Sequence, residues 1–206
     1  MHARRLGRTR PATVARVAAI CLALPLIVSG CLSRVLPEAA PAPVTLDFGP
    51  LPEDAPPPLP LPFRLDRVTA PSWLESTNIY YRRLDEQPAA LTPYARNVWI
   101  ASVPELFAER LAYRLEQAVP DDLDAEPAWL EIELVSFEHV YTSTSDAYVI
   151  ARARAAFEDR AGRTRSRAFE VRRPAPANVG GAIAELPAAA DDLMLDVVAW
   201  LRQDVR

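Results

Sequence analysis

Residues 129–137 read Trp129-Leu130-Glu131-Ile132-Glu133-Leu134-Val135-Ser136-Phe137. Apolar residues alternate with glutamates over most of this stretch, and a period of two is typical of a β-strand that buries one face. The alternation returns over residues 147–157 and 167–173, and turn-forming residues separate the three runs. We therefore predict three consecutive strands that form a meander.

Two helical patterns accompany these strands. Before the meander, Ser102 and Glu105 have the spacing of a capping box, and apolar residues recur every three or four positions until Pro120. After the meander, residues 179–200 carry a second apolar stripe, and Pro187 within them predicts a kink or a new helix start.

Shorter alternating runs predict further strands at residues 63–68 and 78–82 and within residues 90–99. Each predicted helix has one apolar stripe, which it must bury against another element. The sequence therefore predicts an α+β fold, in which a mainly antiparallel sheet carries two amphipathic helices packed on one face.

The N-terminus has the layout of a bacterial lipoprotein signal peptide. Residues 1–30 contain five arginines and no acidic residue, an apolar run covers residues 17–28, and Ser29-Gly30 precedes Cys31. A membrane-spanning helix needs about 20 apolar residues, so this shorter run indicates a cleaved signal. We expect cleavage before Cys31 and lipidation of its thiol. The alternative is an ordinary secretory signal followed by a chance cysteine.

The mature chain would contain 176 residues, which suits one domain. Losing five of the 23 basic residues and none of the 27 acidic ones leaves a net charge of −9, which disfavours nucleic acid as a partner. Cys31 is then the last remaining cysteine, so we expect neither a disulfide nor a thiolate metal site. Prolines recur through residues 31–62, which we interpret as a tether with a candidate edge strand at 44–48, whereas residues 63–206 form the domain.

The sequence offers little for catalysis. Ser136, His139 and Asp146 can be assembled into a triad on paper, but Ser136 lacks the strand–turn–helix elbow of a nucleophile. A lone histidine such as His139 is more typical of an exposed or hydrogen-bonded strand residue. We therefore expect no enzymatic activity.

Metal and cofactor motifs are equally weak. The acidic segment 121–126 lacks the glycine and the final glutamate of a calcium loop, and Gly180-Gly181 lacks the spacing of a dinucleotide site. The arginines within residues 160–173 suit a lipid headgroup, an acidic partner or simply a solvated hairpin. We expect no metal, and no cofactor apart from the covalent lipid on Cys31.

Several features occur together in the order and spacing of one family. They are the cysteine motif at Cys31, Pro71-Ser72-Trp73-Leu74 after a predicted strand, Ile79-Tyr80-Tyr81-Arg82, then Tyr94, Trp99 and Pro104, the strand at 130–137, and Val198-Ala199-Trp200-Leu201 near the end. In these features the chain resembles the ABC-type transport auxiliary lipoproteins that accompany MCE-type lipid transport systems, among them the Pqi-type intermembrane transport lipoprotein. The long proline-rich stretch before Phe63 departs from the family pattern.

The resemblance implies a non-enzymatic lipoprotein that faces the periplasm and contacts the MCE-type protein of its transport system. In such lipoproteins the residue after the lipidated cysteine influences sorting between the two membranes. Leu32 is not the aspartate that is associated with inner-membrane retention, so the outer membrane is favoured.

Aromatic residues supply the candidate contacts with this partner, with one arginine beside them: Trp73, Tyr80, Tyr81, Arg82 and Tyr94. Core packing is the alternative for each aromatic residue, and the favoured one for Trp99 and Trp200. A second hypothesis is a lipoprotein that binds a lipid itself and maintains the envelope without an MCE partner. A third is a surface hydrolase that uses Ser136 or His139. A homo-oligomer is compatible with the sequence.

Overall fold

The computed structural model describes residues 41–51, 62–116, 127–159 and 161–204 of the 206-residue chain. The chain separates into two compact units, Met1–Pro41 and Ala42–Arg206, and the second unit is the one described below. The predicted signal peptide, Cys31, Leu32 and the acidic segment 121–126 lie outside the described residues.

In the described residues, four strands precede the first helix: β1 (Val44–Leu46), β2 (Phe63–Thr69), β3 (Asn78–Arg83) and β4 (Gln87–Trp99). The helix α2 (Val103–Glu116) leads into the meander of β5 (Ala128–Tyr141), β6 (Asp146–Glu158) and β7 (Thr164–Pro176), and α3 (Val179–Asp204) ends the fold. Each predicted strand is present, including the candidate edge strand at 44–48, although β4, β5 and β7 are longer than predicted.

The sheet is mixed, so the prediction of a mainly antiparallel sheet is wrong. Three of its six strand pairings are parallel, namely β1 with β4, β2 with β5 and β3 with β5. The strands follow the order β1-β4-β3-β5-β6-β7, and β2 also pairs with β5. A period of two specifies which face of a strand is buried but not the direction in which the strand runs.

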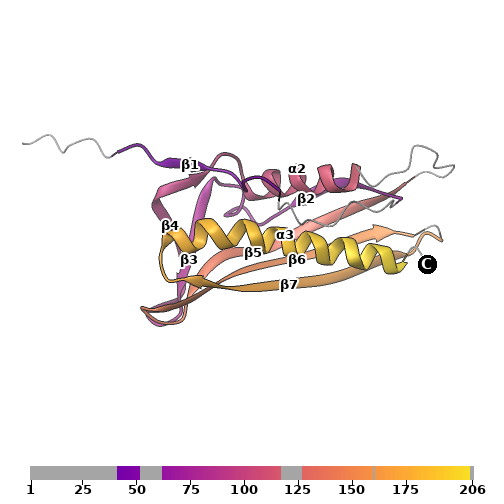
Figure 1. Cartoon of the computed structure of the whole chain (residues 1–206). Helices are drawn as coiled ribbons and strands as arrows, with labels where there is room; N and C mark the ends of the chain where they lie inside the picture. The colour runs from indigo at the N-terminus through magenta and orange to yellow at the C-terminus, as the bar shows by residue number, and fades with distance from the viewer. Residues whose placement is uncertain (1–40, 52–61, 117–126, 160, 205–206) are drawn as a thin grey trace, which may run out of the picture. The chain divides into compact units, whose positions relative to one another are not determined.

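The parallel pairings arise because β2 and β3 lie end to end along one edge of β5. Phe63–Thr69 pairs with residues 128–133 of β5, and Tyr81–Arg83 pairs with residues 139–141. The chain then returns through β4 and α2, so that β5 begins beside β2 and runs in the same direction (Figure 1). β6 occupies the opposite edge of β5 along nearly its whole length.

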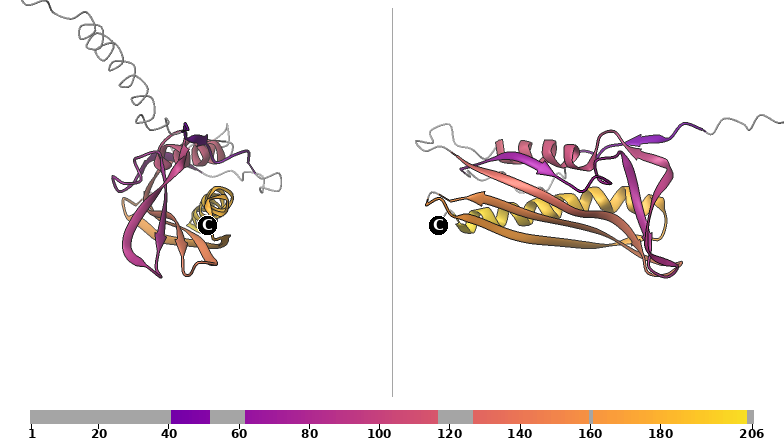
Figure 2. Two further views of the ribbon diagram at one scale, coloured as in Figure 1. Left: turned by 90° about the vertical axis from the view of Figure 1, so that its left-hand side faces the viewer. Right: turned by 180° about the vertical axis from the view of Figure 1, so that it is seen from behind.

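The core lies between the sheet and the two helices. Figure 2 shows α3 running along the meander strands, and α3 contacts β5, β6 and β7 while α2 contacts β2. Leu130, Ile132 and Leu134 of β5 are buried in one hydrophobic cluster together with Phe107 of α2 and Leu193 of α3. The alternation of the quoted stretch is therefore the pattern of a strand with one face on this core.

The termini of the helices agree only partly with the sequence. The Ser102 hydroxyl donates a 2.7 Å hydrogen bond to Glu105, whose backbone N–H donates to that hydroxyl at 3.4 Å, so the predicted capping box is confirmed. The helix α3 continues through Pro187 without a new start.

Candidate functional site

Ser136, His139 and Asp146 do not form a catalytic triad, because no hydrogen bonds join their side chains in the described structure. Ser136 Oγ donates a hydrogen bond to Glu138 at 3.2 Å, and the Asp146 carboxylate accepts hydrogen bonds from Ser143 and Ser145. In the β5–β6 pairing Ser136 lies opposite Arg152 and His139 opposite Val149. The two residues are three positions apart on β5, so their side chains leave opposite faces of the strand. The described geometry thus provides no nucleophile–base pair from these residues.

His139 belongs instead to a tyrosine cluster formed by β3, β4 and β5. The Tyr94 hydroxyl lies 2.7 Å from Nδ1 of His139 and 2.9 Å from the Tyr141 hydroxyl. The Tyr81 ring packs on the Tyr94 ring at a centroid distance of 4.7 Å. The cluster joins three strands through one shared phenol.

The imidazole of His139 is neutral in this cluster. The side chain is completely buried, and its Nε2 has no hydrogen-bond partner among the described residues. Burial lowers the pKa of His139 to about 4 and raises the pKa of Tyr94. A neutral imidazole next to a neutral phenol is an arrangement that holds strands together at neutral pH.

The other residues that were candidates for binding a partner also make contacts within the domain. The Trp73 and Tyr80 rings meet edge to face at 5.4 Å, and the Tyr80 hydroxyl lies 3.2 Å from Ser76 Oγ. Arg82 forms an ion pair with buried Glu138 at 3.0 Å. Trp73, Tyr80, Tyr81, Arg82 and Tyr94 are all only partly buried. Their role in binding a partner remains a prediction.

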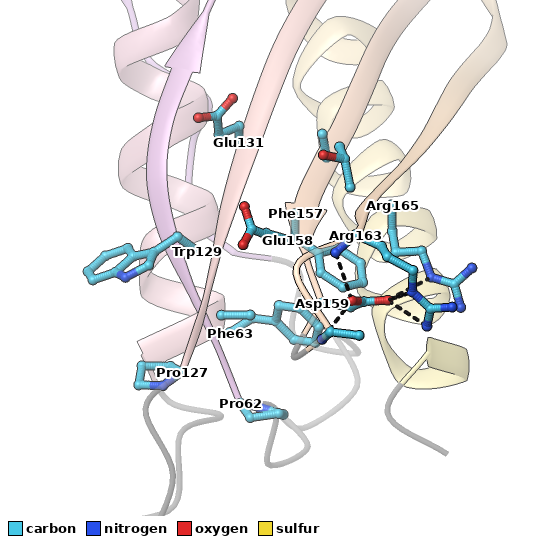
Figure 3. A pocket seen from close by; sticks show the side chains of 14 residues that line it. Pro62, Phe63, Pro127, Trp129, Glu131, Phe157, Glu158, Asp159, Arg163 and Arg165 are labelled. Atoms are coloured by element: carbon cyan, nitrogen blue, oxygen red, sulfur yellow. Dashed lines mark hydrogen bonds and ion pairs between the residues drawn. The ribbon is translucent and has the colours of Figure 1, made fainter.

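A cavity of about 900 Å³ opens at the end of the sheet where β2 and β5 begin and β6 ends (Figure 3). Phe63 and Phe157 line it and meet edge to face at a centroid distance of 4.8 Å. Trp129 also lines the cavity and is 56% exposed. The alternation predicts Trp129 as the start of a strand, and its position on the face of Glu131 and Glu133 predicts an outward side chain.

Most of the charged side chains around the cavity have an ion-pair partner, but one carboxylate has none among the described residues. Arg163 and Arg165 both approach the Asp159 carboxylate, at 2.9 and 3.7 Å, and the Arg163 backbone N–H lowers the pKa of Asp159. Glu131 forms an ion pair with Arg67 at 2.5 Å. Glu158 has no ion-pair or hydrogen-bond partner in the part of the chain that the structure describes. Among the described residues that line the cavity, Glu158 is therefore the carboxylate without a partner.

The arginines that follow on β7 are bound within the protein. Arg172 donates to Glu170 at 2.7 Å, and Arg173 forms ion pairs with Glu185 and Asp192 of α3. Arg167 lies over the Phe169 ring at 5.4 Å. These contacts agree with a solvated hairpin whose charges are internally paired; Arg160 lies outside the described residues.

A second cluster, which we call the clamp, consists of three charged residues, Arg110, Arg114 and Asp191, together with Phe48. Asp191 is 5% exposed and binds Arg110 at 2.5 Å and Arg114 at 2.8 Å, joining α2 to α3. Arg110 also donates hydrogen bonds to the backbone carbonyls of residues 48, 49 and 50. Phe48 packs on Trp99 at 5.4 Å and Phe137 at 5.7 Å. The clamp therefore fixes the chain that leaves β1.

The described residues contain no group of three histidine, cysteine or acidic side chains arranged to hold a metal ion. None of their helices has the length and hydropathy to cross a membrane.

Comparison with known proteins gives a fold but no family. No family model matches the chain, and no curated protein matches it significantly. The crystal structure of a Xanthomonas campestris protein assigned to the family model DUF330 is similar, with a TM-score of 0.60 and 20% identity over 80% of this chain and 96% of that one. The crystal structure of an uncharacterized protein is similar with a TM-score of 0.59 and 11% identity, over 78% of this chain and 99% of that one. At these identities the likeness shows that the fold is shared.

Proposed function

We propose that this chain is a lipid-anchored, non-enzymatic docking protein of the periplasm, which serves as an auxiliary component of an ABC/MCE-type intermembrane lipid transport system at the outer membrane. The observation that supports it best is the separation of two regions within one sheet. The described segment nearest to Cys31 in sequence enters at β1 and is held by the clamp. The cavity lies at the end of the sheet where β2 and β5 begin (Figure 3).

The segment at β1 is well suited to carry an anchor. Val44–Leu46 pairs with the last residues of β4, and Phe48 inserts its ring into the core directly afterwards. Arg110 binds the next three carbonyls and is itself held by Asp191. A lipid on Cys31 would therefore be joined to a fixed point of the domain.

The cavity lies well away from this point. Phe137, which contacts Phe48, and Trp129, which lines the cavity, are both on β5, and eight residues of strand span roughly 26 Å at about 3.3 Å per residue. The chain direction of β1 places Val44 farther from the cavity than Leu46, because β1 runs opposite to β5. A domain anchored through β1 would thus present the cavity away from its anchor.

The test compares two cysteines. Tagged full-length protein is expressed in its native host, envelopes are solubilised, and the co-purified proteins are identified by mass spectrometry. We expect an MCE-type protein or an ABC permease or ATPase with the wild type. We expect Cys31→Ala to leave the membrane fraction, whereas Cys21→Ser, which alters the other cysteine, keeps its membrane location. Absence of any MCE or ABC partner would contradict the proposal.

A lipid-binding lipoprotein without an MCE partner is the alternative, and the cavity of about 900 Å³ beside the exposed indole of Trp129 favours it. Native mass spectrometry of the purified protein, before and after delipidation, separates the two. A stoichiometric bound lipid in a protein without transport partners would support the alternative.

A further inference from the structure

We propose that the cavity at the start of β2 and β5 binds an extended, basic and partly apolar peptide segment of a partner protein. The proposal rests on the docking function above and names the surface through which docking occurs. The residues that carry it are Trp129 and Glu158, and the charge pairs around them decide the chemistry of the ligand.

The apolar part of the ligand is indicated by the aromatic residues. Trp129 is 56% exposed, whereas Trp99 and Trp200 are buried and Trp73 packs on Tyr80. An exposed indole that lines a cavity presents a large apolar surface, and burying this surface against a partner contributes favourably to the free energy of binding. Phe63 and Phe157 also line the cavity, but their side chains are 3% and 6% exposed and lie on the core face of the sheet, so Trp129 supplies the exposed apolar surface.

The basic part of the ligand is indicated by Glu158. Leu130 pairs with Phe157, so Glu158 is the next residue of β6 beside Trp129, on the same face of the sheet. Figure 3 shows the Glu158 carboxylate directed toward the side that holds Trp129 and Glu131. A carboxylate next to an indole is suited to a lysine or arginine side chain, which can form an ion pair and a cation–π contact together.

The neighbouring charges argue against an anionic or zwitterionic lipid headgroup. Arg163 and Arg165, the two described arginines of the cavity wall, are bound to Asp159, and Glu131 neutralises Arg67. Arg64 pairs with Trp129 in the β2–β5 register but does not line the cavity. Arg64 is exposed and has no ion pair among the described residues, so the comparison is confined to the side chains that line the cavity. Among these, the charge without a described partner is that of Glu158, and both arginines already approach Asp159.

The experiment measures peptide binding to the full-length protein in detergent micelles. The probe is the peptide acetyl-Leu-Lys-Leu-Lys-Leu-amide, and its matched control carries glutamates in place of the lysines. Binding is followed by tryptophan fluorescence, and confirmed by calorimetry because the chain has four tryptophans. We expect saturable binding of the basic peptide and none of the acidic one, with weaker binding at high salt.

Two variants locate the site and two serve as controls. Glu158→Gln is expected to weaken binding about fivefold, because an exposed charge contact of this kind contributes on the order of 1 kcal/mol. Trp129→Ser is expected to remove measurable binding. Glu133→Gln and Val135→Ser alter exposed positions of the same strand outside the cavity and are expected to leave binding unchanged.

Equal binding by Glu158→Gln and wild type, or equal binding of both peptides, would overturn the proposal. So would binding of phosphatidylethanolamine vesicles that competes with the peptide and is lost in Trp129→Ser, because the site would then be a lipid site. If Trp129→Ser still co-purifies the transport partners from envelopes, this inference fails while the docking function stands. If no partner co-purifies with the wild type, the docking function itself fails.

Discussion

The clamp and the cavity both contain aromatic residues beside charged ones, but they treat their charges in opposite ways. In the clamp, Asp191 is buried and satisfied by two arginines. In the cavity, Glu158 is exposed and has no partner among the described residues, and Trp129 stands in solvent. The difference separates a region that stabilises the fold from the region at which we propose that a partner binds.

Buried charges are retained only where their partners are complete, since an unpaired one is strongly destabilising. Exposed charges and indoles contribute little to folding, so they remain free to serve recognition. We therefore expect substitutions in the clamp to change stability and substitutions in the cavity to change binding.

Removing the clamp carboxylate should have the largest effect. Asp191→Ala leaves the Arg110 and Arg114 guanidinium groups without their shared partner, and we expect a loss of about 3–5 kcal/mol in the free energy of unfolding. Urea unfolding monitored by circular dichroism measures it. The control is Asp196→Ala, an exposed position of the same helix, which should change the value by less than about 0.5 kcal/mol. A loss below about 1 kcal/mol for Asp191→Ala would contradict the role of the clamp.

Removing the aromatic part of the clamp comes next. Phe48→Ala deletes the ring that packs on Trp99 and Phe137, and we expect a loss of about 3 kcal/mol. Hydrogen exchange should also quicken at β1 and at the end of β4, because Phe48 fixes the strand at this edge. Val44→Ala, at a 56% exposed position of β1, is the control. If exchange quickens at β7 instead, the clamp does not act locally.

The next effect is that of acidification, which should lower the free energy of unfolding through protonation of His139. Its pKa is about 4 in the folded protein and about 6.5 unfolded, so the unfolded chain binds the proton first as the pH falls. Stability is thus complete above about pH 6.5 and decreases toward pH 4, with a loss of about 2 kcal/mol at pH 5. Carboxyls whose pKa is lowered, such as those of Glu105 and Asp159, act at lower pH.

His139→Gln tests this assignment, because it retains a hydrogen-bonding side chain but does not titrate. Unfolding free energies at pH 8 and pH 5 should differ much less in this variant than in the wild type. The other histidine, His2, lies in the predicted signal peptide. An unchanged pH dependence in the variant would show that another group is responsible.

The smallest effect on stability is expected in the cavity. Trp129→Ser should change the free energy of unfolding by less than about 0.5 kcal/mol, because the side chain is largely in solvent already. Thermal unfolding in the absence of peptide measures it. A destabilisation above about 2 kcal/mol would mean that Trp129 is a packing residue, and the contrast between the two regions would then fail.

Local patterns in the sequence predicted most of the secondary structure. The alternation at Leu130, Ile132 and Leu134 and the spacing of Ser102 and Glu105 each specify a local arrangement that needs no distant contact. β5 extends to Tyr141 beyond the predicted strand because a register shift between Leu134 and Ser136 restarts the pairing with β6. The strand direction of β2 and β3 depends on how the chain returns through α2, which no local pattern encodes.

The functional regions were harder to predict, for a similar reason. Arg110 and Asp191 are 81 residues apart, so only the tertiary fold brings them together. The burial of His139 likewise depends on Tyr94 from another strand. Trp129 is different, because its position among outward-facing glutamates was visible in the sequence. The assignment of Trp73, Tyr80, Tyr81, Arg82 and Tyr94 to a partner stays a prediction.

The carbonyl contacts of Arg110 also bear on mechanical force. A pull on the chain ahead of Val44 first stretches β1, which has only three residues paired with β4. Beyond β1, the pull meets a guanidinium group that binds three successive carbonyls and is fixed to α3 through Asp191. Tension is therefore shared by both helices and does not have to be resisted by one short strand, which would suit the anchoring through Cys31 that we propose.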